Sequence, residues 1–125
     1  MITFVKLFNR QMYNQLKLIK KGGYKGIDDT LLERLDDQEI PCDKPRLVSY
    51  HIQQLISEIG EILEADKRWK SFRNEKCDLD NKLEEIADCF IVLMNIAMFS
   101  GCSAEQVLEA INNKISIVEK RIENM

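Results

Sequence analysis

One segment constrains the fold of this 125-residue chain more than any other, the apolar run from Ile86 to Phe99. Only Asp88 and Asn95 interrupt this run with polar side chains. The run is too short to span a bilayer as a helix, which takes about 20 apolar residues. Since it is apolar on nearly every side, we expect a helix that other helices must cover.

Three further segments carry apolar residues at the spacing of an amphipathic helix. Gly22 and Gly23 should end the first helix, and Gly101 should end the third. Ser103, followed by Gln106 three residues later, predicts a capping box for the last helix. We therefore expect an all-α domain over 1–125, a four-to-five-helix bundle with long helices at about 4–20, 47–70, 82–100 and 103–123 and a short one within 29–35.

The charge and cysteine content narrow the class of function. The net charge is −3 at pH 7, whereas binding of nucleic-acid polymers or anionic membranes needs a basic face. Four cysteines without a C-x-x-C pair, and His51 as the only histidine, argue against zinc. The N-terminal MITFVKLFNR lacks the long apolar stretch of a signal peptide. We expect a cytoplasmic protein that binds neither nucleic-acid polymers nor membranes.

Two pairs of acidic residues stand at a spacing that puts both members on one helix face. Glu58 and Glu61 form the first pair, and Glu85 and Asp88 form the second, at the head of the apolar run. A carboxylate near a core is normally paired with a cation. Four carboxylates from two facing helices would make an all-oxygen site suited to Mg²⁺ or Mn²⁺, which commonly hold nucleotide phosphates.

Less specific interpretations of these acids stay open. A single E-x-x-[ED] pair is common on solvated helix surfaces. Lys114 and Arg121, on one face of the last helix, can supply salt bridges to the acids instead of a metal. Asn95 lies two turns beyond Asp88 on the same face. It is either a supporting partner of the acids or only a buried amide.

These motifs resemble the E-x-x-E … E-x-x-D signature of the all-α nucleotide pyrophosphohydrolases, the MazG-like proteins with the dimeric dUTPases and dCTP pyrophosphatases. The segment LISEIGEILEADKRWK is similar to the first metal-binding helix of that family, and KLEEIADCFIVLMNIA is similar to the second. The similarity covers roughly residues 4–121. It implies a MazG-like bundle that is completed by oligomerisation.

The resemblance also implies an activity, the Mg²⁺-dependent hydrolysis of a nucleoside triphosphate to nucleoside monophosphate and pyrophosphate. Glu58, Glu61, Glu85 and Asp88 would be the metal ligands, and Glu58 or Glu61 would also orient or deprotonate the attacking water. The water would attack the α-phosphorus. A deoxynucleotide such as dUTP, or a modified pyrimidine nucleotide, would be the substrate in a house-cleaning role.

Residues for substrate binding follow from the same resemblance. Gln11 and Asn14 match a first-helix Q-x-x-N that reads the pyrimidine edge, and Trp69 matches an aromatic residue that stacks on the base. Two surface amides and a core or interface indole are the alternatives. Lys114 and Arg121 resemble basic residues of the last helix that contact phosphates.

The chain departs from the family pattern at three points. Ser57 stands where many members have a second acid, and Ile117 and Val118 stand where many have an arginine after the lysine. The extra helices of the longer dimeric dUTPases are missing. A single chain is therefore not expected to complete the pocket, and we expect a homodimer or a tetramer built from dimers, with the site near a subunit boundary.

Another class of function remains compatible with the sequence. A non-catalytic helical module would keep the fold and use its apolar faces for oligomerisation or interaction. A ferritin-like di-metal protein would need E-x-x-H motifs, which a chain with one histidine does not provide.

Overall fold

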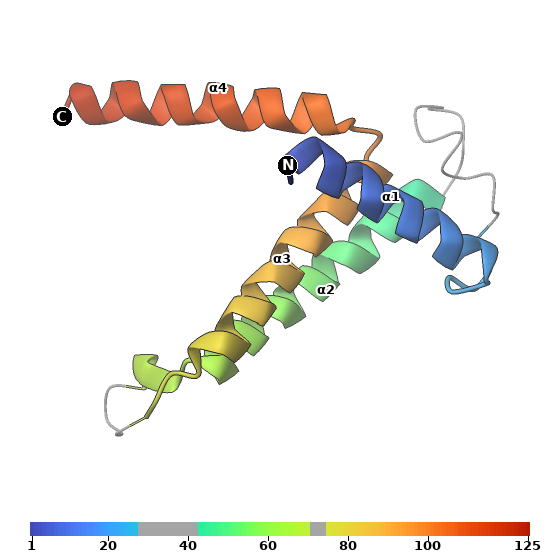
Figure 1. The fold of residues 1–125 in the computed structure, drawn as a ribbon, viewed down its shortest axis with the longest axis horizontal. Helices are drawn as coiled ribbons and strands as arrows, with labels where there is room; N and C mark the ends of the chain where they lie inside the picture. Colours follow the sequence, from blue (N-terminus) through green and yellow to red (C-terminus); the bar gives the residue numbers. More distant parts are fainter. Residues whose placement is uncertain (28–42, 71–74) are drawn as a thin grey trace.

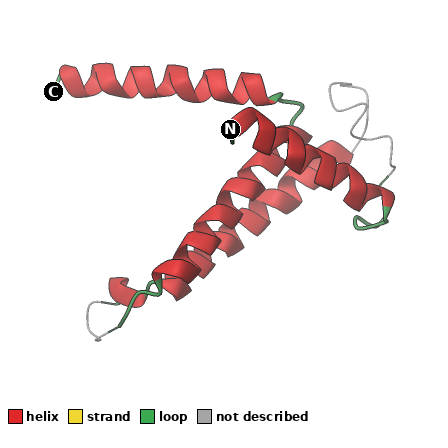
Figure 2. Ribbon diagram, viewed as in Figure 1, coloured by secondary structure: helices red, strands yellow, loops and turns green. Residues whose placement is uncertain are grey.

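The computed structural model describes residues 1–27, 43–70 and 75–125, and within these ranges all regular structure is helical (Figure 2). The expected all-α class is thus confirmed. The elements are, in chain order, α1 (Phe4–Lys20), α2 (Asp43–Ala65), the 3₁₀ helix η2 (Lys67–Trp69), α3 (Leu79–Phe99) and α4 (Ala104–Glu123).

Most helix ends lie where local sequence predicts them. The left-handed residues Gly22 (φ 76°) and Gly101 (φ 84°) follow the ends of α1 and α3, where a side chain with a Cβ would be strained. The capping box at the start of α4 is present: the Ser103 hydroxyl accepts from the Gln106 backbone N–H, and the Gln106 side chain accepts from the Ser103 N–H. The short helix expected within 29–35 lies outside the described residues.

The second helix differs from its predicted range of 47–70. It begins four residues earlier, at Asp43, and ends at Ala65. Asp66 has an extended backbone, and its carboxylate accepts a hydrogen bond from the backbone N–H of Arg68. This cap ends α2 and starts η2. The segment that carries Trp69 is therefore a separate turn.

The helices form two limbs that meet at a junction (Figure 1). α2 and α3 pack along their lengths as an antiparallel pair, and α1 crosses one end of that pair. α4 leaves the junction at the same end and projects away from the α2–α3 pair, contacting α1 near its own start. The C-terminus consequently lies at the far tip of a limb.

The core lies at the junction. Its central side chains are Phe8 of α1 and Met98 and Phe99 of α3, all at 0% exposure, together with Ile19 and Leu47. Partly buried residues of α1 and the start of α4 pack against this cluster. The sequence therefore builds one compact contact between the ends of the helices, and the two limbs extend from it.

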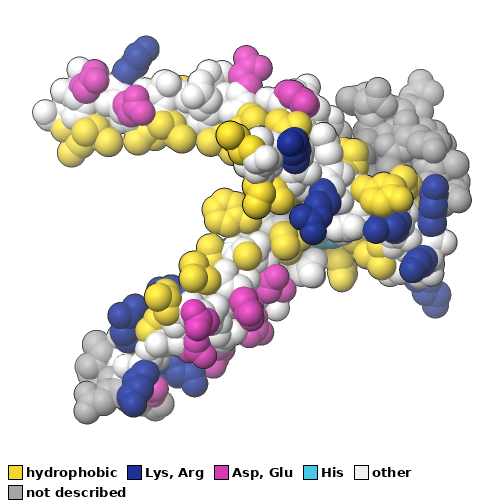
Figure 3. Space-filling view, viewed as in Figure 1, with side chains coloured by type: hydrophobic (Ala, Val, Ile, Leu, Met, Phe, Trp, Pro, Cys, Tyr) yellow, Lys and Arg dark blue, Asp and Glu magenta, His cyan; other side chains and the backbone are white. Residues whose placement is uncertain are grey.

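The cover expected around the third helix is only partial in one chain. α2 and α1 cover one side of α3, whereas several large apolar residues on its other sides are exposed, Phe90 at 61%. The α4 limb is exposed from Leu108 onward, including an apolar stripe at helical spacing. Figure 3 shows apolar side chains along the faces of both limbs that border the hollow between them. Large apolar residues that are exposed on these two helices include Leu83, Phe90, Ile91 and Leu93 on α3, and Leu108, Ile111, Ile115, Val118 and Ile122 on α4.

None of the described helices is long and apolar enough to span a membrane by itself. α3 and α4 meet the length and composition criteria only as a pair, which is bent by 114° at its break.

The junction core yields a prediction about stability. Phe8→Ala removes a fully buried ring from the contact that joins α1 to the rest of the chain, and should lower the free energy of unfolding by about 3–5 kcal/mol. Tyr13→Ala, at an exposed position of the same helix, is the matched control and should stay within about 0.5 kcal/mol. Urea unfolding followed by circular dichroism measures both; equal losses would contradict a core centred on Phe8.

Candidate metal centre

Three of the four predicted carboxylates come together in the structure. Glu58 projects from α2, and Glu85 and Asp88 project from α3. One carboxylate oxygen from each lies within 4.8 Å of the others. Acidic side chains gather along the α2–α3 pair in Figure 3. We call Glu58, Glu85 and Asp88 the acidic cluster.

The antiparallel packing of α2 and α3 positions the acidic cluster. Glu85 and Asp88 are one turn apart, so both face the same side of α3. Glu58 approaches from the neighbouring helix, which no short-range sequence contact would achieve. Glu61, the fourth predicted ligand, is exposed and lies outside the group of three. Its charge is still close enough to affect Glu85.

The electrostatics show mutual repulsion within the cluster. Partial desolvation raises the pKa of Glu85, and the charges of Asp88, Glu58 and Glu61, with a hydrogen bond to Glu58, raise it further. Desolvation and the charges of Glu58, Asp88 and Glu85 also raise the pKa of the adjacent Cys89 thiol. Among the described residues, no lysine or arginine forms an ion pair with the cluster. Three carboxylates in this arrangement fit a hard divalent cation, which would relieve their repulsion.

A polar cavity opens beside the acidic cluster, between α1, α2 and α3. It has a volume of about 360 Å³, and both Glu58 and Asp88 line it. The remaining lining is mainly polar or aromatic and comes from all three helices and the turn after α1. Among these residues are Gln11, Gln15, Tyr24, Tyr50, His51, Gln54 and Asn95.

Gln11 and Asn14, the predicted base-reading pair, lie one turn apart on α1 and are in contact, but only Gln11 lines the polar cavity. The Gln11 Nε2 donates to Asn95 Oδ1 at 2.9 Å, so Gln11 faces the polar cavity. Asn14 is exposed and faces a second, largely apolar groove of about 450 Å³ between α1 and α3, which Gln11 also borders. A weak 3.5 Å contact joins the Asn14 Nδ2 to the Gln11 Oε1. Asn95 therefore supports Gln11 and is itself a wall of the cavity.

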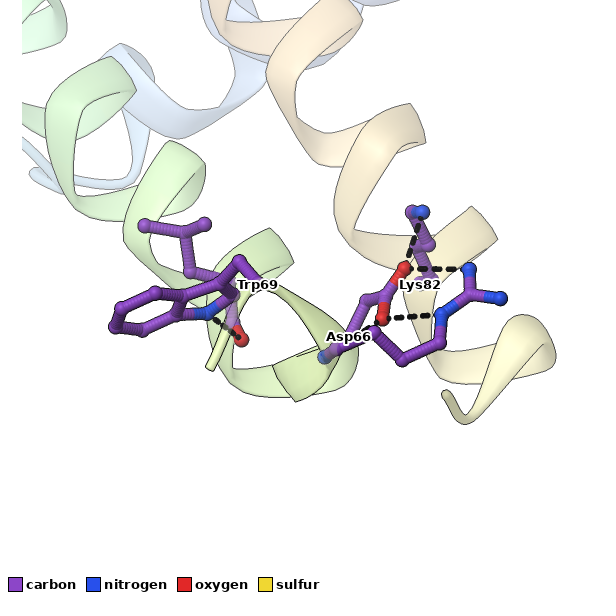
Figure 4. A network of polar contacts seen from close by, with 5 residues as sticks. Asp66, Trp69 and Lys82 are labelled. Carbon is purple, nitrogen blue, oxygen red and sulfur yellow. Dashed lines mark hydrogen bonds and ion pairs between the residues drawn. The ribbon is translucent and has the colours of Figure 1, made fainter. Parts of the chain in front are cut away.

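Trp69 lies at the other end of the α2–α3 pair. Its indole N–H donates to the Leu63 carbonyl at 3.3 Å, and the ring is 58% exposed (Figure 4). Because α1 crosses the opposite end of the pair, Trp69 and Gln11 do not meet in one chain (Figure 1). A shared role in binding one base would require a second chain.

The end of the helix pair near Trp69 is held by an ion-pair network. Asp66 accepts from Lys82 Nζ at 2.7 Å and from Arg68 at 2.8 Å (Figure 4). These hydrogen bonds hold the pKa of Asp66 well below its usual range. The Asp78 N–H also donates to the Ala65 carbonyl, at 3.0 Å. The network ties the start of α3 to the end of α2 and thereby fixes the register that brings the acids together.

Lys114 and Arg121 are exposed on α4 and form no ion pair within the described part of the chain. The sequence-based alternative, in which they bridge to the acids, is not seen there. Since α4 projects away from α2 and α3, contact with phosphates at the acidic cluster would need an α4 from another chain.

The residues that the sequence did not point out are those of the cavity wall: Gln15, Tyr24, Tyr50, His51 and Gln54. One signal was available for Gln15. It is four residues before Ile19 and seven after Phe8, on the core-facing side of α1. An amide at a core position marks either a buried hydrogen bond or a binding site.

Comparisons of this chain with protein-family models, with curated proteins and with solved structures found no match. The geometry of the acidic cluster and of the adjoining cavity therefore has to indicate the function.

The acidic cluster predicts a stabilising response to Mg²⁺. Saturating Mg²⁺ should raise Tm by several degrees, since a ligand at a hundredfold excess over its Kd adds about 2.7 kcal/mol. Glu85→Gln should raise Tm without metal, because one repelling charge is removed, and should largely abolish the Mg²⁺ response. Thermal unfolding with and without Mg²⁺ tests this.

Glu84→Gln provides the control for that experiment. Glu84 is the exposed neighbour of Glu85 and lies outside the cluster, so its variant should keep the wild-type response to Mg²⁺. Identical Mg²⁺ responses in Glu85→Gln and Glu84→Gln would show that the acidic cluster does not bind the ion.

Proposed function

We propose that this protein is a Mg²⁺-dependent nucleoside triphosphate pyrophosphohydrolase of the MazG-like type, acting on a deoxynucleoside triphosphate such as dUTP or a modified pyrimidine nucleotide. The observation that carries the proposal is the convergence of Glu58, Glu85 and Asp88 from two helices, beside a polar cavity. An acidic cluster would repel a triphosphate unless a cation lies between them. The cavity then offers room for the rest of the nucleotide.

The cluster residues would hold Mg²⁺ or, with the same ligands, Mn²⁺. Such an ion would supply charge neutralisation on the phosphates and a water of lowered pKa. Glu58 or Glu61 would orient the attacking water and accept its proton. Oxygen from the water joins the α-phosphorus while the bond from that phosphorus to the bridging oxygen breaks, releasing nucleoside monophosphate and pyrophosphate.

The activity is tested by measuring pyrophosphate release from a panel of dNTPs with and without Mg²⁺. Turnover should require Mg²⁺, and Glu58→Gln should reduce kcat/KM by about 100-fold or more, because a ligand of the metal site is lost. Glu64→Gln is the control. Glu64 is an exposed acid on the same helix, outside the cluster, and its variant should behave like wild type. Absence of turnover for every nucleotide would refute the enzyme.

We further propose that the functional unit is a homodimer, or a tetramer built from dimers. The exposed apolar stripe of α4 and the exposed apolar face of α3 both border the hollow between the limbs (Figure 3). Large exposed apolar patches on a small protein usually mark an interface. A second copy carries the same stripe and the same hollow, so each α4 can cover the other chain's α3 in a closed, twofold arrangement.

Ile115→Glu tests the assembly. Ile115 lies in the middle of the exposed stripe of α4, and a buried carboxylate there would oppose association. Light scattering after size-exclusion chromatography should show a dimer or tetramer for wild type and a shift of the variant to monomer. Asn113→Glu adds the same charge on the opposite face of α4 and should leave the mass unchanged. A monomeric wild type at micromolar concentration would contradict the assembly.

The exposed apolar stripe also favours the second candidate function, a helical interaction module without catalysis. Calorimetry separates the two functions, since a module of that kind would bind neither Mg²⁺ nor a nucleoside triphosphate.

A further inference from the structure

The polar cavity contains two buried amides that are only half used by the fold. Gln15 is 6% exposed and Asn95 is 5% exposed. The Gln15 Oε1 accepts from the Tyr24 hydroxyl at 2.6 Å, and the Asn95 Oδ1 accepts from Gln11 Nε2 at 2.9 Å. In the described part of the chain, neither amide nitrogen has a partner.

These two amide nitrogens must reach the cavity. Every fully enclosed side-chain nitrogen or oxygen among the described residues has a hydrogen-bond partner. The nitrogens of Gln15 and Asn95 lack a partner there, so they are open to a space, and the space that both residues line is the polar cavity. Buried donors are normally satisfied, so an acceptor inside this cavity would complete the hydrogen bonding of both amides.

The wall behind the amides consists of packed, uncharged aromatic side chains. The His51 ring is 1% exposed, stacks on Phe99 with centroids 5.2 Å apart, and is hydrogen-bonded through Nδ1 to the Leu47 carbonyl at 2.8 Å. Burial lowers the pKa of His51, so its imidazole is neutral at pH 7. Burial also raises the pKa of Tyr24 to about 12, so its hydroxyl keeps its proton. A neutral group of the ligand therefore suits this end of the cavity.

The neutral end and the acidic end are separated by a defined length of helix. Asn95 is seven residues after Asp88 on α3, and His51 is seven residues before Glu58 on α2. Seven residues of α-helix rise about 10 Å. The end of the cavity formed by Asn95 and His51 therefore lies about 10 Å along the helices from the acidic cluster. A molecule with a polyanionic end and a neutral polar end, joined by a short spacer, matches this arrangement.

We propose that the polar cavity binds the base of the nucleotide, and that the amide nitrogens of Gln15 and Asn95 donate to a carbonyl oxygen on the base ring. This proposal rests on the pyrophosphohydrolase function proposed above. The phosphates lie at the acidic cluster, and the base lies between α1, α2 and α3. Uracil, thymine, cytosine and guanine carry such an oxygen, whereas adenine carries none.

The direction of the donors gives the selectivity. The Asn95 oxygen accepts from Gln11, so Asn95 presents its NH₂ group to the ligand. The single hydroxyl hydrogen of Tyr24 is donated to the Gln15 oxygen, at 2.6 Å, in preference to His51 Nε2, at 3.2 Å, so Gln15 also presents its NH₂ group. A carbonyl oxygen can accept from two such donors through its two lone pairs. The exocyclic amino group of adenine would instead place donors against donors, leaving buried groups unpaired. Bases with a ring carbonyl are thus favoured.

Calorimetry with non-hydrolysable α,β-imido nucleotides in the presence of Mg²⁺ tests the base site. Inorganic tripolyphosphate serves as the probe for the acidic cluster alone. Wild type should bind imido-dUTP at least about tenfold more tightly than imido-dATP or tripolyphosphate. Gln15→Met and Asn95→Leu should each weaken imido-dUTP about tenfold and leave tripolyphosphate binding unchanged.

Two more variants keep the test decisive. Gln54 is half-buried, lines the cavity and makes no hydrogen bond to the described part of the fold, so Gln54→Met leaves the fold intact and should weaken imido-dUTP about threefold. Gln53→Met, at an exposed position outside the cavity, should bind like wild type. If the two buried variants lose their helical circular dichroism, the comparison of Gln54→Met with Gln53→Met decides.

The outcomes distinguish the two proposals. Wild type that binds tripolyphosphate with Mg²⁺, but binds imido-dUTP and imido-dATP equally well, overturns the base site and leaves the hydrolase standing. Unchanged imido-dUTP affinity in the folded cavity variants does the same. Wild type that binds neither tripolyphosphate nor any imido nucleotide overturns both proposals.

Discussion

The antiparallel packing of α2 against α3 is the contact on which the site depends, because it holds like charges together. Glu58 stands on one helix, Glu85 and Asp88 stand on the other, and their mutual repulsion opposes the packing. The pairing is maintained from its two ends. Asp66 and Lys82 tie one end, and the junction core around Phe99 holds the other. The acids lie between these two anchors, where a cation would convert repulsion into attraction.

Much of the fold followed from local sequence, because helix periodicity and caps act over a few residues. Gly22 and Gly101, and the Ser103–Gln106 capping box, ended or began helices where expected. The end of α2 was missed because Asp66 takes hydrogen bonds from Arg68 and Lys82, and the contact with Lys82 depends on the tertiary fold. The spacing of apolar residues along a helix cannot predict such a contact.

In the site, too, features set by spacing within one helix were predictable, whereas contacts between helices were not. Spacing of three along α3 predicted that Glu85 lies beside Asp88, and the sequence also singled out Glu58, which faces them. The same spacing on α2 did not bring Glu61 into the cluster with Glu58. The cavity wall was hidden, since Gln15, Tyr24 and His51 meet only after α1 crosses the α2–α3 pair. The large sequence separation of Gln11 from Asn95 illustrates why their hydrogen bond could not be anticipated from spacing.

The projecting limb has a consequence for how the chain acquires its structure. An isolated helix in water is only marginally stable, because most helical stability in proteins comes from tertiary packing. Beyond its first turn and Val107, α4 is exposed along its whole length. Its helical order would then be coupled to docking against another surface. In the proposed dimer, α4 would become ordered as the chains associate. The mean residue ellipticity of this protein at 222 nm would then become more negative as its concentration rises.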